Sequence, residues 1–245
     1  MHGLYKLKTK ALLTVVLFLF LQSCKETFNN KLHNEIKLFN GNNLDGWVNY
    51  GGGNFYVENN YIVAEPIEEL PNTFLHTKQK YQDFELEFDV KLDTVLNSGV
   101  QIRSNIYQKE TVTKVWVGKF DENGNKISKI RKWAAGRFWG YQIEIDPSSR
   151  SWSGALYEEG GRGFLHTPGI NENVKSAFIQ MKWNHFKIKV QGNHIQSWIN
   201  GQIIADVYDD LNSNGYIALQ LHGIGTDSSK LNKKIYWKNI TLKKL

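Results

Sequence analysis

Short runs in which apolar and polar residues alternate dominate the chain from Ile36 onward. Residues 84–92 (FELEFDVKL) and 185–190 (HFKIKV) follow a strict period of two, which is the pattern of a strand with one buried face. Hairpin signals separate such runs, and Asn200-Gly201 is the most convincing of them. Since no long amphipathic helical stretch follows the N-terminal segment, the pattern predicts one all-β domain, a sandwich or a jelly roll.

One segment breaks this rhythm. Residues 107–139 form an insertion rich in Lys, Arg and Trp between two strong strands, and we expect an inserted flap there. The run 121–125 (DENGN) is like the start of a calcium loop, but Lys132 stands where the last acidic ligand would fall, so a hairpin turn is predicted. The aromatic residues of the insertion either form a sugar-stacking wall or pack as the small core of the flap, and the second interpretation is favoured. These residues are Trp116, Trp133, Phe138 and Trp139.

The N-terminal segment has the organisation of an export signal. Three lysines precede the apolar run 11–21 (ALLTVVLFLFL), which is too short to span a bilayer comfortably as a helix. The run ends in Leu21-Gln22-Ser23-Cys24, which resembles a bacterial lipobox, where the cysteine is acylated and becomes the new N-terminus. Because Cys24 is the only cysteine of the chain, this interpretation is favoured over an ordinary secretory signal.

These features predict a domain organisation and a location. We expect a lipoprotein signal peptide over 1–23, a polar tether over 24–35 and a single domain over 36–245. The protein would then be an exported bacterial lipoprotein, anchored to a membrane through a lipid on Cys24, in the periplasm or at the cell surface. With its one cysteine acylated, the chain cannot form an internal disulfide.

Composition changes this picture in two respects. Aromatic residues make up 13% of the chain, a content that suits large sheets better than a helical bundle. The formal net charge is +6, but three of the lysines lie in the signal segment, and without residues 1–23 there are 27 basic residues against 24 acidic ones. A mature chain so close to balance gives no electrostatic reason to expect nucleic-acid binding.

Three predicted strands, residues 100–103 (VQIR), 141–146 (YQIEID) and 219–222 (LQLH), carry polar residues at every second position. Because side chains alternate between the two faces of a strand, each polar set lies on one side of its sheet. A solvated face would also alternate, but these sets contain no lysine, so a functional floor is favoured over a plain wet face. If the three strands are neighbours, they form the floor of a cleft. The polar residues are Gln101, Arg103, Gln142, Glu144, Asp146, Gln220 and His222.

The carboxylate pair of the central strand invites comparison with retaining glucanases of the laminarinase type. Glu144 and Asp146 fit the first two places of the Glu-x-Asp-x-Glu or Glu-x-Asp-x-x-Glu strand of those enzymes. Ser148 and Ser149 occupy both places open to the acid/base glutamate. Because retaining hydrolysis needs two carboxyl groups on either side of the bond, about 5 Å apart, that chemistry is rejected.

Several phrases, taken in order, resemble the 3-keto-disaccharide hydrolase family. They are residues 38–47 (LFNGNNLDGW), 97–103 (NSGVQIR), 140–146 (GYQIEID) and 215–223 (GYIALQLHG). The resemblance runs from about Leu38 to the C-terminus. It implies a concanavalin A-like jelly roll of two antiparallel sheets with a concave cleft, often in an exported lipoprotein, and activity on glycosides oxidised to a ketone at C3. Gln142 departs from the family, since many relatives carry Glu at its place.

The resemblance also implies a reaction. A ketone at C3 acidifies the hydrogen on C2, so a base can remove that proton, the aglycone departs from C1, and water adds back. Glu144 and His222 are the alternatives for the base, and Arg103 is the expected electrophile at the enolate or carbonyl. Tyr157 is the candidate acid for the leaving group.

The remaining polar residues are expected to bind substrate. Asp146 would orient His222 or bind a sugar hydroxyl, and three amides would hold further hydroxyls. A divalent metal held by Glu144, Asp146 and His222 would be an alternative Lewis acid in place of Arg103, and this alternative stays open. The three amides are those of Gln101, Gln142 and Gln220.

A binding module is the rival class of function. Jelly rolls also serve as lectins, and the fold alone does not decide between the two. A lectin needs stacking aromatics and amides but no titrating base, so an enzyme is favoured, with a non-catalytic carbohydrate-binding module as the alternative. The sequence leaves open which aglycone and which anomer are accepted, whether the bond is cleaved by direct hydrolysis or by elimination, and what the oligomeric state is.

Overall fold

The structure is a computed structural model, and it describes residues 35–169 and 172–245. The chain divides into two units, Met1–Ile36 and Lys37–Leu245, and the first lies almost wholly outside the described residues. The expected signal peptide, the polar tether and Cys24 fall in that undescribed part. Within the two described ranges, no helix is both long enough and apolar enough to cross a membrane.

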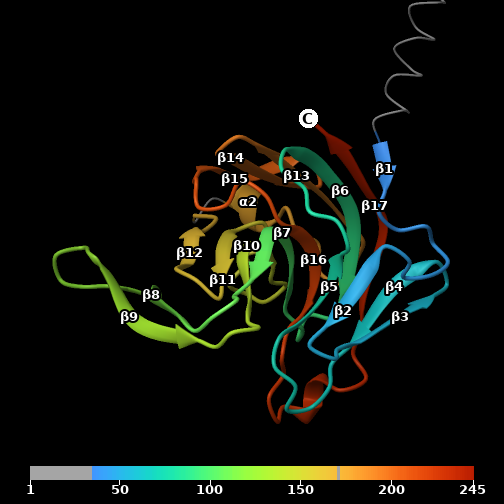
Figure 1. Ribbon diagram of the computed structural model, residues 1–245, viewed down its shortest axis with the longest axis horizontal. Helices are drawn as coiled ribbons and strands as arrows, with labels where there is room; N and C mark the ends of the chain where they lie inside the picture. The colour runs from blue at the N-terminus through green and yellow to red at the C-terminus, as the bar shows by residue number, and fades with distance from the viewer. Residues whose placement is uncertain (1–34, 170–171) are drawn as a thin grey trace, which may run out of the picture. The chain divides into compact units, whose positions relative to one another are not determined.

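Two antiparallel sheets form the unit Lys37–Leu245 (Figure 1). The first has the spatial order β15-β14-β13-β6-β17-β4-β3 and the second the order β12-β11-β10-β7-β16-β5-β2. Chain neighbours such as β6 and β7 lie in different sheets, which is the connectivity of a jelly roll and not of a meander.

The strands of the first sheet are β3 (Asn54–Glu58), β4 (Tyr61–Glu65), β6 (Phe84–Leu92), β13 (Asn184–Gln191), β14 (His194–Ile199), β15 (Gln202–Tyr208) and β17 (Ile235–Lys244). Those of the second are β2 (Trp47–Tyr50), β5 (Thr73–Thr77), β7 (Ser98–Ile106), β10 (Phe138–Ile145), β11 (Leu156–Glu159), β12 (Gly163–His166) and β16 (Tyr216–Leu221). The other elements are β1 (Glu35–Lys37), β8 (Thr111–Phe120), β9 (Lys126–Trp133), the short helix α2 (Glu172–Lys175) and a 3-10 turn, η1 (Ser228–Lys230).

The apolar faces of the sheets form the core. Along β6 every second residue is buried and the residues between them are half-buried, as the alternating sequence predicts. Phe88 of this strand stacks on Phe186 of β13, with ring centroids 5.1 Å apart. Ile143 and Ile145 of β10 are fully buried on the inner side of the second sheet. The predicted all-β sandwich of two antiparallel sheets is confirmed.

The second sheet differs from the first in having strands that are buried on both faces. In β7 the first seven residues are buried, in β10 all but Trp139, and in β16 all but the first. Burial of the polar as well as the apolar positions means that side chains and neighbouring segments cover the outer face too. This face is therefore the floor of a covered site and not an ordinary wet surface.

The hairpin signals of the sequence produce tight turns. Asn200 and Gly201 join β14 to β15, and both have positive φ, 49° and 86°. A two-residue turn of this kind needs the left-handed region at both positions, which Asn and Gly tolerate best. The predicted turn is confirmed.

The insertion contains a two-stranded hairpin, β8 and β9, which among the described strands pairs only with itself. Figure 1 shows it extending away from the sheets beside β11 and β12. Its turn is closed by Asp121, whose Oδ1 accepts the backbone N–H groups of Asn123 at 2.9 Å and Asn125 at 2.8 Å. The predicted hairpin turn, in place of a calcium loop, is confirmed.

The favoured interpretation of the aromatic residues in the insertion is wrong, because they do not form one small core. Phe138 is buried in β10 and stacks on Phe74, with centroids 4.5 Å apart. Trp139 stacks on Tyr107 at the base of the hairpin. The remaining two, Trp116 and Trp133, line a cleft over the second sheet.

Candidate functional site

The three strands with polar rows are neighbours, in the order β10-β7-β16, as the predicted floor requires. A cleft of about 820 Å³ lies over them. The hairpin and the segments 94–97 and 146–152 contribute to its walls. Six of the eight residues proposed from the sequence line this cleft: Gln142, Glu144, Asp146, Tyr157, Gln220 and His222.

Gln101 lies beneath the floor and begins a directed chain of hydrogen bonds. Ser104 Oγ donates to Gln101 Oε1 at 2.6 Å, and Gln101 Nε2 donates to Gln142 Oε1 at 2.5 Å. Gln142 Nε2 then donates to Glu144 Oε2 at 2.9 Å. Each amide is oriented by the one behind it, so the chain presents a fixed donor to Glu144. Gln101 therefore supports Gln142 and does not itself reach the cleft.

Gly99 makes room for this chain. It pairs with Glu144 across β7 and β10, and a Cβ atom built on it would lie 2.4 Å from Gln142 Cδ. Any side chain at this position would displace the Gln142 amide from its place between Gln101 and Glu144. The glycine belongs to the sequence phrase 97–103, but its role is visible only once the register is known.

Glu144 is a buried carboxyl group at the centre of the floor. Its side chain is 7% exposed, and it accepts hydrogen bonds from Asn97 Nδ2 at 2.8 Å and from Gln142 Nε2. Burial raises the pKa of Glu144 to about 7, because an ion is poorly solvated there. The two amide donors and, more weakly, Arg150 oppose this increase in pKa, and Asp146 adds to it. Glu144 thus exchanges a proton near neutral pH, as a general base or acid must.

Asp146 does not orient His222, so the first of its two expected roles is wrong, and the second, a contact with a sugar hydroxyl, stays a prediction. Its Oδ2 accepts from Arg150 Nε at 2.7 Å, and its Oδ1 accepts from the backbone N–H of Ser148 at 3.1 Å. Arg150 follows four residues later in a short loop, which brings the guanidinium back over the carboxylate. It also lies over the Trp152 ring, 4.2 Å from the centroid. Asp146 therefore holds Arg150 at the edge of the cleft.

His222 follows the end of β16 and is exposed in the cleft. Its Nδ1 lies 2.7 Å from the carbonyl oxygen of Gly223. Since a carbonyl oxygen only accepts, Nδ1 carries the proton and the neutral ring has its lone pair on Nε2. Among the described residues, Nε2 has no partner, so it is free to take a proton.

Glu159 is a third carboxyl group in the cleft, and sequence reasoning missed it. It is 5% exposed, forms an ion pair with Arg137, and accepts longer hydrogen bonds from Asn72 and Gln220, both at 3.5 Å. Burial is the main cause of its raised pKa, which Arg137 and then His222 oppose. Its position two residues after Tyr157, on the same face of β11, was the signal that could have identified it.

Tyr157 lies beside Gln142, its partner in the β10–β11 register. Burial, followed by the negative charges of Glu159 and Glu144, raises the pKa of its hydroxyl well above its ordinary value. The phenol is therefore protonated throughout the physiological range and can only donate its proton to a stronger base.

Arg103 does not belong to the floor, and this expectation is wrong. The register of β7 shifts at this position, and Arg103 has a φ of 47°, so the strict alternation of faces is interrupted. Its buried guanidinium pairs with Asp83 at 2.6 Å and donates to the carbonyl oxygens of Gln82 at 2.6 Å and Gly192 at 2.7 Å. Arg103 therefore ties the second sheet to loops of the first.

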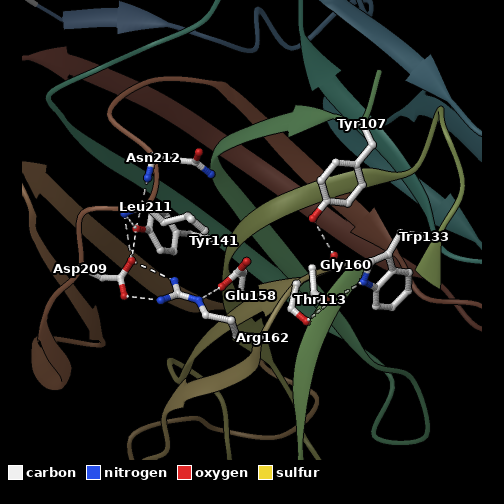
Figure 2. Close-up of polar contacts among 11 residues, drawn as sticks. Tyr107, Thr113, Trp133, Tyr141, Glu158, Gly160, Arg162, Asp209, Leu211 and Asn212 are labelled. Carbon is white, nitrogen blue, oxygen red and sulfur yellow. Dashed lines mark hydrogen bonds and ion pairs between the residues drawn. The ribbon is translucent and has the colours of Figure 1, made fainter. Parts of the chain in front are cut away.

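A second polar network supports the floor from behind. Figure 2 shows Arg162 between Asp209, to which it donates two hydrogen bonds at 2.9 Å, and Glu158. Tyr141 of β10 also donates to Asp209. Tyr141 and Glu158 alternate with the cleft residues along β10 and β11, so this network fixes the two strands from the face opposite the cleft.

Hydrogen bonds near the β11–β12 turn hold the hairpin in place, and Figure 2 shows these contacts as well. Tyr107 Oη donates to the carbonyl oxygen of Gly160 at 3.1 Å, and Thr113 Oγ1 to that of Gly161 at 3.3 Å. Trp133 Nε1 donates in turn to Thr113 Oγ1 at 2.7 Å. The hairpin is therefore a fixed wall of the cleft.

The cleft combines groups that exchange protons with groups that bind polyhydroxylated molecules. Its walls carry Trp116, Trp133 and Trp152, and its floor carries amides that offer both donors and acceptors. Gln220 Oε1 is buried and has no hydrogen-bond partner among the described residues.

Among the residues that the structure describes, no three His, Cys, Asp or Glu side chains are grouped as a metal site would require. The three residues named for a metal thus do not converge.

Comparison with known families gives one match over most of the chain. The model of the 3-keto-alpha-glucoside-1,2-lyase-like domain matches residues 34–243. No curated protein matches the chain.

Solved structures with the same fold include two candidate glycosyl hydrolases from Parabacteroides distasonis ATCC 8503. One is 16% identical, with a TM-score of 0.55, and covers 89% of this chain and 96% of its own. The other is 21% identical, with a TM-score of 0.52, and covers 86% of this chain and 99% of its own. A protein of unknown function with a galectin-like fold from Bacillus subtilis is 12% identical, with a TM-score of 0.51, and covers 82% and 90%. At these identities the likeness concerns the fold alone.

Proposed function

Because the chain belongs to the 3-keto-alpha-glucoside-1,2-lyase-like family, we propose that it cleaves the glycosidic bond of 3-keto-glycosides by elimination followed by hydration. The observation that carries this proposal is Glu144, a buried carboxyl group with a pKa of about 7 on the floor of a cleft that also holds the free Nε2 of His222. A base for the C2 proton and a second group that can accept a proton from water are what the reaction needs.

In the first step, Glu144 removes the proton from C2. The electron pair of the C2–H bond moves toward the C3 carbonyl and gives an enolate, with the negative charge on the C3 oxygen. That charge then returns to form a C1–C2 double bond, the C3 carbonyl is restored, and the C1–O bond to the aglycone breaks. The hydrogen bonds from Asn97 and Gln142 hold the carboxylate in one orientation for this transfer.

Two further groups act on the charges that develop. Arg150 lies over the cleft edge, held by Asp146, and its guanidinium stabilises the enolate oxygen in the place first assigned to Arg103. Tyr157, a protonated phenol, gives its proton to the departing aglycone oxygen, so the aglycone leaves as an alcohol and Tyr157 becomes a phenolate.

Water then completes the net hydrolysis. His222 Nε2 accepts a proton from the water molecule as its oxygen adds to C1. Glu144 returns a proton to C2 after exchange with water, and the proton on His222 passes to the Tyr157 phenolate, so all three groups recover their starting states. No carboxylate attacks C1, so the cleft does not need the pair of carboxyl groups that a retaining glycosidase uses.

The experiment compares a 3-keto-glucoside with the same glucoside before oxidation. We expect the wild-type protein to release the aglycone from the keto form only, because the C3 carbonyl is what makes the C2 proton removable. Glu144→Gln should lower turnover by about 10²–10⁴-fold, the usual effect of losing a general base. Glu110→Gln makes the same chemical change on an exposed side chain of the insertion and should leave turnover unchanged.

Two results would contradict the proposal. Comparable turnover of the unoxidised glucoside would mean that the C3 carbonyl is not used. Binding of the keto form with no turnover by the wild-type protein would instead favour the lectin-like alternative, in which the tryptophan walls and floor amides only hold the sugar.

A further inference from the structure

Two cations on one face of the hairpin have no acidic partner in the part of the chain that the structure describes. Lys129 and Arg131 lie two residues apart on β9, opposite Val115 and Thr113 of β8, and both line the cleft. The sequence of β8 and β9 contains six basic residues and no acidic one. The hairpin therefore presents positive charge to the cleft.

The other cations of the cleft are paired with carboxylates. Arg137 pairs with Glu159, and Arg150 with Asp146 at 2.7 Å. Lys230 lies 3.4 Å from Asp227. The cleft lining contains five Lys or Arg side chains and three Asp or Glu side chains, and Asp227, the partner of Lys230, lies outside the lining. Lys129 and Arg131 are the two lining cations that have no carboxylate partner among the described residues.

Arg131 is close enough to influence the floor. Its positive charge is one of the contributions that lower the pKa of the Tyr157 hydroxyl, against the larger effect of burial. Its guanidinium also lies 5.9 Å from the centre of the Trp133 ring, and Arg137 lies 5.4 Å from the same ring. Arg131, Trp133 and Arg137 thus form a continuous wall that reaches Glu159.

We propose that Lys129 and Arg131 form a subsite for an anionic group, a carboxylate or a sulfate, on the aglycone of the substrate. Two side chains on one face of a strand and two residues apart are about 7 Å from each other, so both can reach one anionic group. The assignment to the aglycone rests on the proposed function, in which Tyr157 faces the departing oxygen and Arg131 lies on that side. The substrate class is then an acidic glycoside.

The test uses binding, which does not depend on the chemistry. Affinities are measured by calorimetry for two unoxidised glucosides, one with a 4-carboxyphenyl and one with a 4-carboxamidophenyl aglycone, which differ in charge and little in shape. We expect the carboxylate to bind about three- to thirtyfold more tightly at low salt, the range for two partly exposed ion pairs. The preference should shrink at about 1 M salt, where the Debye length is about 3 Å.

A matched pair of double variants locates the effect. Lys129→Ala/Arg131→Ala should abolish the preference for the carboxylate. Lys114→Ala/Lys132→Ala removes the same charge from the opposite face of the hairpin and should preserve it. Equal affinities for the two glucosides in the wild-type protein, including no binding of either, would overturn the proposal. An equal loss of the carboxylate preference in both double variants would also overturn it, because the preference would then come from the overall positive charge of the hairpin and not from a subsite.

Turnover of the matching 3-keto-glucosides separates this proposal from the one on which it rests. If neither keto substrate turns over but the binding preference holds, the proposed function fails and the anion subsite stands. If both turn over with equal kcat/KM, the function stands and the subsite fails. A third substrate with a 4-(sulfooxy)phenyl aglycone, a sulfate ester, shows by its affinity which of the two anions the subsite prefers.

Discussion

Glu144→Gln should stabilise the protein at alkaline pH while it removes activity. The carboxyl group has a pKa of about 7 in the folded protein, against 4.5 in the unfolded chain. Between these two values the folded state holds a proton that the unfolded state has lost, so the free energy of unfolding falls as the pH rises. At pH values well above 7, Glu144 is a buried ion that destabilises the fold.

The size of the effect follows from the two pKa values. A shift from 4.5 to about 7 gives the wild-type protein a loss of about 2–3 kcal/mol between pH 5 and pH 8 that a neutral side chain does not have. Gln keeps one oxygen for the Asn97 and Gln142 donors and loses the other. That loss acts at both pH values and cancels in the comparison.

The assay is urea unfolding of the wild-type and Glu144→Gln proteins at pH 5 and pH 8. Other carboxyl groups with a raised pKa, such as Glu158 and Glu159, titrate in both proteins, so their contributions cancel in the difference between them. We expect the difference in unfolding free energy, variant minus wild type, to increase by about 2–3 kcal/mol from pH 5 to pH 8. An unchanged difference, or one that moves the other way, would refute the claim that Glu144 has a raised pKa.

Three further predictions follow from single positions. Gly99→Ala should lower turnover about tenfold or more with a loss of about 1–3 kcal/mol of stability, because the added methyl group displaces Gln142; equal turnover in an aglycone-release assay would contradict this. Arg103→Ala should reduce the free energy of unfolding by about 3–5 kcal/mol, because it removes a buried cation that ties two loops together, and it should leave kcat of the folded fraction near normal. A loss of kcat without destabilisation would mean that Arg103 acts in the cleft after all. We also propose that Cys24 carries the lipid anchor of an exported protein, so Cys24→Ser should move the protein out of the membrane fraction, whereas unchanged fractionation would exclude a lipid at this residue.

The alternation of residues predicted much of the floor. A period of two places Gln142 and Glu144 on one face whatever the details of the fold, and the same is true of Gln220 and His222. The sandwich followed from the same signal, because the apolar half of each strand must be buried against another sheet.

The errors arose where local geometry breaks that period. Arg103 lies at a bulge, so its side chain turns away from the face that Gln101 indicates. Asp146 was expected beside His222, but a short loop returns Arg150 to it, and four residues of loop give no alternation from which to infer that contact. Glu159 was missed because its strand has only four residues, so its position two residues after Tyr157 is a weak signal of a shared face.

The central claim, removal of the C2 proton by this cleft, is tested most directly with a 3-keto-glucoside that carries deuterium at C2. Aglycone release and the isotope at C2 are followed together by NMR in ordinary water, with the free keto sugar incubated without protein as the control for spontaneous exchange. Elimination and hydration predict that every molecule that loses its aglycone exchanges its C2 deuterium for hydrogen, and that release is slower than from the undeuterated substrate. Aglycone release with the deuterium retained at C2, at an unchanged rate, would contradict the account.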